Sequence, residues 1–359
     1  MRAIIQNSFG GPDVLVIADR PAPSPEAGEV LVRIEAAGIN PVDGAVRGGH
    51  YPLLGEPPFV LGWDVSGTVE ALGSGVSGLK VGDAVFGMPR FPKQAAAYAE
   101  LAAVPADELA PKPEGIDHAQ AAALPLAGLT AWQGLVRHGR LDSAKRVLIH
   151  AGAGGVGHLA VQIAKAHSAY VVATASPEKL DFVRSLGADE VIDYTRDDFT
   201  AKARDIDLVL DPFGGVHAEQ SLKVLTAGGV LVSLLDVSDA TKAKARTRGI
   251  HVERMSVVPD RAALVELGKL IDAKKLAVHV AKAVSPRTGR CRPCLSRHQA
   301  DRQGGADGLK LQIVDPRRRK GADQRPYRPN AGIAGCAWCA GRQGRIRRST
   351  LARTGIPRW

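Results

Sequence analysis

Cysteine is absent from the first 284 residues of this 359-residue chain, and all four cysteines follow: Cys291, Cys294, Cys336 and Cys339. A disulfide framework and a thiolate metal site are therefore excluded for those first 284 residues. No apolar run is long enough to span a membrane, and the start of the chain lacks the apolar core of a signal peptide. These absences predict a cytoplasmic protein with no membrane partner.

An excess of basic residues is also missing from most of the chain. Residues 285–359 hold 18 of the 47 basic and 4 of the 37 acidic residues, which leaves 29 basic and 33 acidic residues in 1–284. The formal net charge of +10 therefore belongs to the last 75 residues. Binding to nucleic acid would depend on that tail alone, so we do not expect a nucleic-acid partner.

Two textures of sequence indicate two domains. In the first third, short β-branched runs at 30–35, 65–72 and 83–87 are separated by glycine-rich turns, which is typical of an antiparallel barrel or sandwich. From about residue 119, apolar helical stretches alternate with strand-like runs. These runs lie at 147–150, 170–175, 189–194, 207–211 and 229–235. Such alternation predicts an α/β domain, with a parallel sheet that helices cover on both faces.

A glycine-rich loop lies between the first of these strands and a helical stretch. Residues 151–157 read AGAGGVG, so Gly152, Gly154 and Gly157 fit the fingerprint of a dinucleotide fold. Gly155 and Val156 complete the loop. The glycines permit a tight turn and close approach of the backbone to a pyrophosphate, and the following helix N-terminus favours an anion. A flexible glycine-rich turn with no ligand is the alternative interpretation.

The residues after the second parallel strand favour NADPH as the cofactor. An NAD site places an acid about 20 residues beyond the glycines, where it holds the ribose 2′-hydroxyl. This chain has Ser176 there, followed by Pro177, Glu178 and Lys179. A lysine without that acid suits a 2′-phosphate better. Alternatively, Ser176 only caps the next helix and Lys179 is only a solvated charge.

Five segments in a fixed order resemble the zinc-free quinone oxidoreductase branch of the medium-chain dehydrogenase/reductases. They are AGINPVD (37–43), LGWDVSG (61–67), VGDAVFG (81–87), LPLAGLTAW (124–132) and the glycine loop. The resemblance implies a GroES-like, β-rich catalytic domain at 1–122 and a Rossmann domain with a doubly wound parallel sheet at 123–262. It further implies a return segment to the catalytic domain at 263–315, atypical from about residue 284, and leaves a basic tail at 316–359.

The resemblance also implies that the site holds no metal. The zinc alcohol dehydrogenases carry a cysteine ligand where this chain has Asn40, and a His-Glu pair where it has Trp63 and Asp64. Asparagine is a poor zinc ligand and tryptophan is none, so Asp64 alone could not hold the ion. We therefore expect hydride transfer from NADPH to an acceptor that conjugation already activates, a quinone or an α,β-unsaturated carbonyl.

Candidate catalytic and cofactor residues follow from the same resemblance. Asn40 would donate a hydrogen bond to the developing oxyanion, or it only makes a turn with Pro41. Asp64 and Tyr51 are the other catalytic candidates. Thr130 would touch the nicotinamide end, or its hydroxyl bonds back within its own helix. Tyr194 would pack by the adenine ribose phosphate, or it only fills the domain surface.

The predicted function is thus an NADPH-dependent quinone or enone oxidoreductase, and the expected assembly is a homodimer. Asp43 is expected to brace the loop of Asn40. His50, His138, His150 and His158 show no ligand spacing and are interpreted as structural. The alternative from another class is a non-catalytic NADPH-binding sensor or scaffold protein.

The tail admits two interpretations. The CxxC pairs at 291–294 and 336–339 could form a zinc site, although the 41 residues between them are many for a simple ribbon. The favoured interpretation is a shifted reading frame with read-through after Asp315, because the segment lacks any foldable periodicity. Only residues 309–314, LKLQIV, match the return strand of the family.

Overall fold

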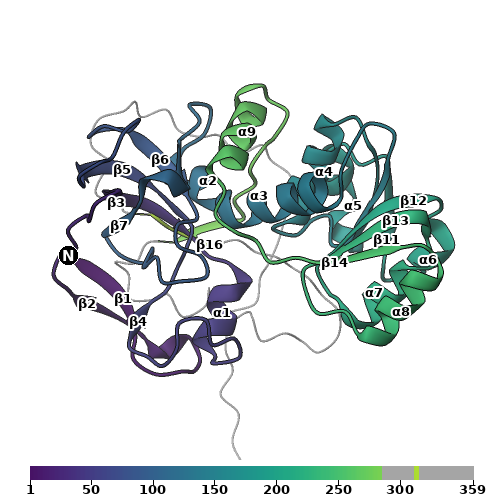
Figure 1. Cartoon of the computed structure of the whole chain (residues 1–359), viewed down its shortest axis with the longest axis horizontal. Coiled ribbons are helices and arrows are strands. Elements are labelled where there is room, and N and C mark those ends of the chain that lie inside the picture. The colour runs from purple at the N-terminus through teal and green to yellow at the C-terminus, as the bar shows by residue number, and fades with distance from the viewer. Residues whose placement is uncertain (285–310, 315–359) are drawn as a thin grey trace, which may run out of the picture. The chain divides into compact units, whose positions relative to one another are not determined.

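A computed structural model describes residues 1–284 and 311–314 of the chain. Within these residues the strands form one parallel sheet, one antiparallel sheet and one mainly antiparallel sheet (Figure 1). This combination confirms the predicted α/β class with a GroES-like, antiparallel β domain and a Rossmann-like domain. The zinc-site and frame-shift interpretations of the tail concern residues outside the described ones, and the domain limits stay predictions.

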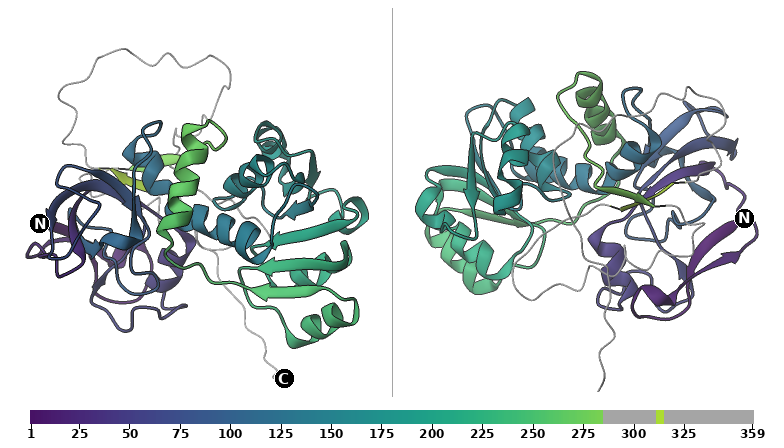
Figure 2. Two further views of the ribbon diagram at one scale, coloured as in Figure 1. Left: turned by 45° about the horizontal axis from the view of Figure 1, so that its top comes forward. Right: turned by 180° about the vertical axis from the view of Figure 1, so that it is seen from behind.

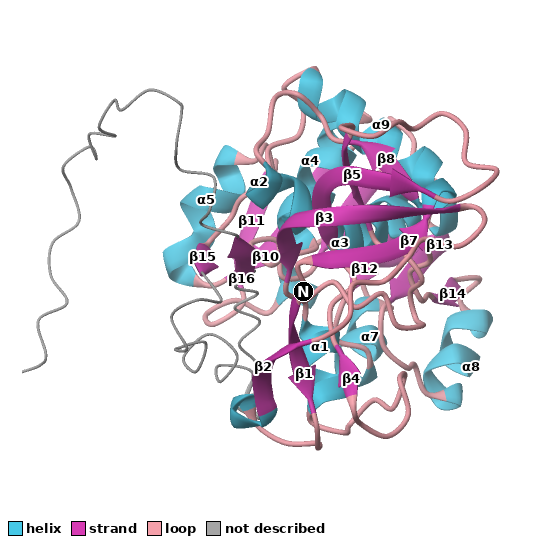
Figure 3. Ribbon diagram, turned by 90° about the vertical axis from the view of Figure 1, so that its left-hand side faces the viewer, coloured by secondary structure: helices cyan, strands magenta, loops and turns pink. Residues whose placement is uncertain are grey.

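The antiparallel strands come from the first third of the chain and from its return segment. One sheet has the order β2-β1-β4, with β1 (Arg2–Gln6), β2 (Leu15–Asp19) and β4 (Phe59–Val60). The other has the order β15-β16-β3-β5-β6-β8, and β7 also pairs with β3. Its strands are β3 (Glu29–Gly38), β5 (Val65–Leu72), β6 (Ala84–Gly87), β7 (Leu101–Pro105), β8 (Leu109–Pro111), β15 (Lys282–Val284) and β16 (Leu311–Val314). Figure 3 shows β5, β3 and β7 side by side.

These pairings confirm the strands predicted around 30–35, 65–72 and 83–87. They also confirm the return strand predicted at 309–314, because β16 pairs antiparallel with β3 and parallel with β15. Strand β3 is central since its valines, Val30 and Val32, are fully buried and it receives neighbours on both edges. This sheet therefore joins residues 274 positions apart, Gln312 with Gly38.

The parallel sheet has the order β11-β10-β9-β12-β13-β14. Its strands are β9 (Arg146–Ile149), β10 (Tyr170–Ala175), β11 (Glu190–Asp193), β12 (Ile206–Asp211), β13 (Leu225–Ser233) and β14 (His251–Arg254). The first five match the predicted runs, whereas β14 was not predicted. The chain order changes direction between β9 and β12, and such a switch point is where doubly wound sheets bind ligands.

Side chains of this sheet alternate between two hydrophobic cores. Val147 and Ile149 belong to one core and Leu148 to the other, as the period of two in a strand requires. Both faces of the sheet are apolar, and helices cover both. Helices α4 and α5 lie along one side and α7 and α8 along the other (Figure 1). The two further views in Figure 2 show helices on both sides of the same sheet.

The helices among the described residues are short. They are α1 (Pro41–Arg47), α2 (His118–Ala123), α3 (Pro125–Trp132), α4 (Gly157–Ala166), α5 (Leu180–Ser185), α6 (Phe199–Lys202), α7 (Gly215–Ser221), α8 (Asp239–Thr247) and α9 (Arg261–Asp272). Single turns of 3₁₀-helix form η1 (Pro12–Val14), η2 (Ala106–Glu108) and η4 (Pro177–Lys179), and η3 (Gln133–His138) is a π-helix. In the described part of the chain, no helix is both long and apolar enough to cross a membrane.

Candidate functional site

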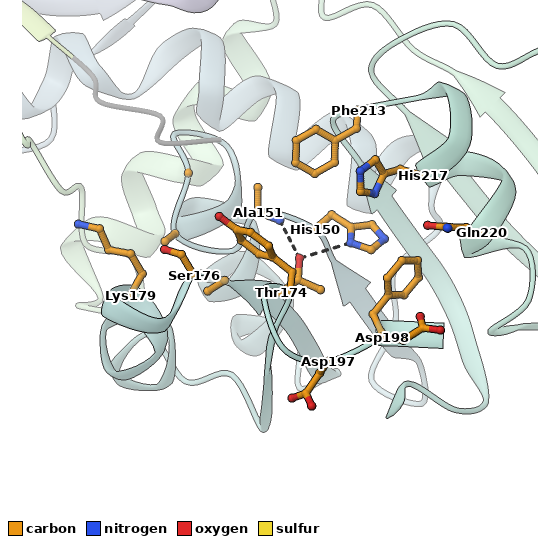
Figure 4. A pocket seen from close by; sticks show the side chains of 15 residues that line it. His150, Ala151, Thr174, Ser176, Lys179, Asp197, Asp198, Phe213, His217 and Gln220 are labelled. Atoms are coloured by element: carbon orange, nitrogen blue, oxygen red, sulfur yellow. Dashed lines mark hydrogen bonds between the residues drawn. The ribbon is translucent and has the colours of Figure 1, made fainter. Parts of the chain in front are cut away.

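A pocket of about 370 Å³ lies at the carboxyl ends of the parallel strands (Figure 4). Loops after β9, β10 and β11 and the start of α7 line it, so it lies at the topological switch point. Open parallel sheets bind their ligands at this place because loops on either side of the switch diverge and leave a crevice. The lining includes Gly154, Ser176, Lys179 and Tyr194, four of the predicted cofactor residues.

Glycines are required in the loop after β9 because the backbone packs on itself there. A Cβ at Gly157 would lie 2.0 Å from the carbonyl oxygen of Ala151, and one at Gly152 would lie 2.9 Å from Cβ of Ala173. Gly155 and Val156 follow the loop into α4, whose N-terminus provides amide groups and a partial positive charge. The predicted loop thus forms a turn with no room for a side chain at Gly152 or Gly157, followed directly by an anion-favouring helix end.

Thr174, at the end of β10, fixes this loop at two points. Its hydroxyl accepts a hydrogen bond from the amide of Ala151 at 3.1 Å, and its carbonyl accepts one from the amide of Gly152 at 2.8 Å. Ala151 adopts a φ of 53°, a region that costs a residue with a side chain about 1–2 kcal/mol. The amide of Gly154 closes the turn by donating to the Ala151 carbonyl at 2.8 Å. The surroundings therefore impose this loop conformation on Ala151.

One end of the pocket carries a lysine and a serine. Ser176 and Lys179 follow β10 directly and lie apart from Asp197 and Asp198 at the other end (Figure 4). Ser176 occupies the N-cap position of the turn η4, but its hydroxyl makes no capping bond and instead donates to the carboxylate of Glu178. The expected cap is therefore wrong in its hydrogen bond, because Glu178 in the first turn competes for the hydroxyl.

The acids that line the pocket already have other partners. Asp198 caps α6 by accepting hydrogen bonds from the amide of Thr200 at 2.8 Å and from its hydroxyl at 2.9 Å. Asp197 pairs with Lys202, with 3.2 Å between oxygen and nitrogen. The last residue of β10 is Ala175, so no acid stands at the strand tip where an NAD site would hold the ribose. The strand tip therefore offers no carboxylate to a ribose 2′-hydroxyl.

A second cluster of predicted residues forms around Asp64, which is fully buried. Its Oδ2 accepts a hydrogen bond from Nδ2 of Asn40 at 2.8 Å, and its Oδ1 accepts one from the amide of Leu126 at 2.8 Å. Asp64 therefore connects the start of α1, where Asn40 is the N-cap, with the first turn of α3. The structure brings Asn40, Asp64 and the helix of Thr130 together.

Asp43 braces Asn40, as expected, because its Oδ2 accepts a hydrogen bond from the Asn40 amide at 2.6 Å. The carboxyl is 1% exposed, and burial raises its pKa from 3.8 to about 7. A neutral acid is favoured there because no solvent stabilises the charge. The orientation of Asn40 thus depends on one carboxyl that titrates near neutral pH and on a second one at its side-chain amide.

Two predicted residues lie in less informative surroundings. Thr130 is buried, and its hydroxyl donates to the carbonyl of Leu126 at 2.6 Å, so the bond within its own helix is present. Tyr51 follows α1 on a loop, and 40% of its surface is exposed. Their roles at a cofactor or substrate stay predictions.

The sequence did not indicate an aromatic cluster deep in the pocket. His150, Phe213 and His217 line the pocket beside Phe199, and the ring of His150 stands edge-on to that of Phe199 at 4.7 Å between centroids. Burial lowers the pKa of His150 to about 3, so the imidazole is neutral. The only signal for His150 was its position directly before the glycine loop.

The residues at the implied zinc position are committed to other contacts. The indole nitrogen of Trp63 donates to the carbonyl of Lys93 at 2.7 Å, and both oxygens of Asp64 are bonded as described above. In the described ranges, no group of three or more His, Cys, Asp or Glu side chains could hold a metal ion. This donor set does not fit zinc.

Two family models match the chain. The alcohol dehydrogenase GroES-like domain matches residues 26–114, and a model described as zinc-binding dehydrogenase matches residues 186–286. The chain is also similar to the NADPH-dependent alkenal/one oxidoreductase, chloroplastic, of Arabidopsis thaliana, with 42% identity over 244 residues. That match covers 65% of this chain and 62% of the relative, so the chain spans less than two thirds of that protein.

Solved structures resemble the chain over most of its length. The quinone oxidoreductase from Coxiella burnetii has a TM-score of 0.78 at 33% identity, covering 88% of this chain and 99% of that one. The Escherichia coli quinone oxidoreductase complexed with NADPH has a TM-score of 0.75 at 29% identity and covers 88% and 100%. These likenesses extend across both kinds of sheet described above.

Proposed function

Because the chain belongs to the medium-chain dehydrogenase/reductase superfamily, in its branch of quinone and alkenal/one oxidoreductases, we propose that it is an NADPH-dependent, zinc-independent reductase of quinones or α,β-unsaturated carbonyls. The observation that carries the proposal is the pocket at the switch point, which combines a closed glycine loop with a serine-lysine end. The homodimer and the cytoplasmic location stay predictions.

The loop and the helix start fit the diphosphate of the cofactor. Gly152, Gly154 and Gly157 have no side chains that would separate a phosphate from the backbone amides, and the α4 N-terminus attracts the negative charge. Lys179 would hold a 2′-phosphate by charge, and Ser176, once its hydroxyl turns away from Glu178, would donate a hydrogen bond to it. Tyr194, which lines the same end of the pocket and is 41% exposed, would cover the adenosine. NADPH complexed with a relative of 29% identity supports this choice of cofactor.

Asn40 and Asp64 would act at the substrate. When bound, NADPH supplies the hydride, and the protein needs only to align the acceptor and stabilise the charge that develops on its oxygen. The amide nitrogen of Asn40 has two hydrogens, and Asp64 accepts a bond from that nitrogen at 2.8 Å. The second hydrogen can be donated to the substrate oxygen. Asp64 would hold the amide in the donating orientation, while Thr130 and Tyr51 would line the space beside it.

The full chain tests this proposal by NADPH consumption with three acceptors: a simple quinone, an unsaturated aldehyde and its saturated counterpart. We expect NADPH to be oxidised by the first two and not by the third, because conjugation already activates the first two, whereas a saturated carbonyl needs stronger polarisation than one amide donor supplies. Added zinc should not raise the rate. Binding of NADPH without oxidation by any acceptor would favour the sensor or scaffold alternative. Rapid reduction of the saturated aldehyde would contradict the assigned substrate class.

A further inference from the structure

The base of the nucleotide pocket contains a buried histidine with two hydroxyl partners. His150 follows β9 and is 3% exposed, with Nδ1 at 3.4 Å from the hydroxyl of Thr174 and Nε2 at 3.0 Å from the hydroxyl of Ser221. Phe199 packs against its ring, and the ring of His217 lies 6.2 Å away between centroids. A histidine so enclosed is almost completely shielded from solvent, and the proposed reaction does not use it.

The neighbouring hydrogen bonds determine which ring nitrogen carries the proton. Ser221 donates its only hydroxyl hydrogen to the main-chain carbonyl of His217 at 2.8 Å, so it can only accept from His150. We therefore assign the proton of the neutral ring to Nε2 of His150. Because the imidazole is neutral, Nδ1 is then an acceptor, and the hydroxyl of Thr174 donates to it while accepting from the amide of Ala151.

Every hydrogen bond in this series therefore points the same way, from donor to acceptor. The order from the loop is Ala151 amide, Thr174 hydroxyl, His150 ring, Ser221 hydroxyl and the His217 carbonyl on α7. The dashed lines in Figure 4 mark its first two bonds. Each inner member accepts one hydrogen bond and donates one, so the loss of any member would leave a buried donor or acceptor unpaired.

Within this series of hydrogen bonds, the orientation of the Ala151 peptide has the most direct effect on the glycine loop. The peptide of Ala151 has a positive φ, and its carbonyl both accepts from the amide of Gly154 and fills the space that a Cβ at Gly157 would occupy. A strained residue keeps such a conformation only when its surroundings hold it. Thr174 holds it through the Ala151 amide, and His150 fixes the direction of the Thr174 hydroxyl.

We propose that His150 is a positioning residue for the nucleotide: as the Nε2-protonated tautomer, it joins helix α7 to the glycine loop and holds the loop in the shape that grips the diphosphate. The inference rests on the proposed function, because it assumes that NADPH binds at this loop. Breaking this series of hydrogen bonds should lower the affinity for the diphosphate. The affinity for a 2′-phosphate at the end of the pocket where Ser176 and Lys179 lie should not change.

Substitutions of Thr174 give the most specific test. Valine keeps the shape of the side chain without the hydroxyl, and serine keeps the hydroxyl without the methyl group. Thr174→Val should raise the Kd for NADPH about tenfold, the effect of one net buried hydrogen bond, and Thr174→Ser should restore it. Adenosine 2′-monophosphate, which lacks the diphosphate, should bind the Val variant as it binds the parent. Ser221→Ala removes the other hydrogen-bond partner of His150 and should weaken NADPH binding in the same way. This variant provides the test if Thr174→Val does not fold.

The matched control is Thr226→Val. Thr226 lies at the other end of the same sheet, where its one hydroxyl hydrogen is shared between the Ile206 carbonyl and the Asp207 carboxylate, so NADPH affinity should not change. Parent-like NADPH affinity in both Thr174→Val and Ser221→Ala would overturn the proposal. Equal weakening of both ligands would also overturn it, because the effect would then be a general collapse of the pocket. If NADPH does not bind the parent, the proposed function itself fails.

The tautomer gives a second, independent readout. In a ¹⁵N NMR spectrum at neutral pH, the His150 signals should be those of a neutral ring protonated at Nε2, and Thr174→Val should shift the Nδ1 signal. A ring protonated at Nδ1 would overturn the chain of donors described above.

Discussion

The glycine loop and the Asn40 cluster are two parts of one proposed site that are held in opposite ways. Around the loop the side-chain groups are neutral: the hydroxyls of Thr174 and Ser221 and the uncharged ring of His150. Around Asn40 they are carboxyls, Asp43 on its amide and Asp64 on its side chain. Neutral hydroxyls and an imidazole thus hold the loop proposed to bind an anionic cofactor, whereas buried carboxyls orient the proposed donor on the acceptor side.

The largest effect is expected from breaking the loop itself. Gly157→Ala places a Cβ 2.0 Å from the Ala151 carbonyl, so the loop must move. We expect a loss of about 3 kcal/mol in NADPH binding, or about a hundredfold in Kd. Gly115→Ala is the control, because a Cβ there makes only ordinary contacts at 3.8 Å or more. Titration of both variants measures the difference, and equal Kd values would show that the loop does not bind the cofactor.

The carboxyl side is tested by Asp64→Asn. One of the two donors, the Leu126 amide or the Asn40 side chain, would then face an amide NH₂ group instead of an oxygen. We expect the free energy of unfolding to fall by about 2 kcal/mol and kcat to fall with it, because Asn40 loses its orientation.

Asp117→Asn is the matched control, since Asp117 caps α2 at the surface and asparagine caps equally well. Its unfolding midpoint in urea should equal that of the parent. A parent-like kcat in Asp64→Asn would show that the buried carboxylate is not needed at the acceptor side.

The two regions should also differ in the sign of their pH dependence. Asp43 has a pKa of about 7 in the folded protein and 3.8 as an ordinary carboxyl, so its contribution to stability is present below pH 3.8 and lost as the pH rises through 7. His150 has a pKa of about 3 against an ordinary 6.5, so its contribution is present above pH 6.5 and lost as the pH falls towards 3.

Between pH 3.8 and 6.5 these two contributions oppose each other, at up to about 1.4 kcal/mol per pH unit each. Asp43→Asn removes one of them. The stability of this variant relative to the parent should therefore rise with pH across that window, as measured by urea unfolding at several pH values. A difference that is flat with pH would mean that Asp43 is ionised in the folded protein throughout the window.

Local features of the fold were predictable from the sequence, and long-range contacts were not. The glycine loop could be recognised because its residues are adjacent and its strand and helix flank it. Strand β14 escaped prediction because HVER shows one apolar residue and lies at the sheet edge, where three of its four residues are exposed. The His150–Ser221 contact joins residues 71 positions apart, and the contact between Asp64 and Leu126 spans 62. The sequence around each of these residues gives no indication of its distant partner.

The most direct measurement is a pair of equilibrium titrations, NADPH and NADH, with the parent, Lys179→Gln and Lys242→Gln. Lys242 lies on α8 beside Asp239, outside the pocket lining, and serves as the matched charge control. We expect the parent and the control to bind NADPH about tenfold more tightly than NADH, as for one charge-assisted contact, and Lys179→Gln to lose this preference. Equal affinities for the two nucleotides in the parent, or an unchanged preference in Lys179→Gln, would contradict this expectation.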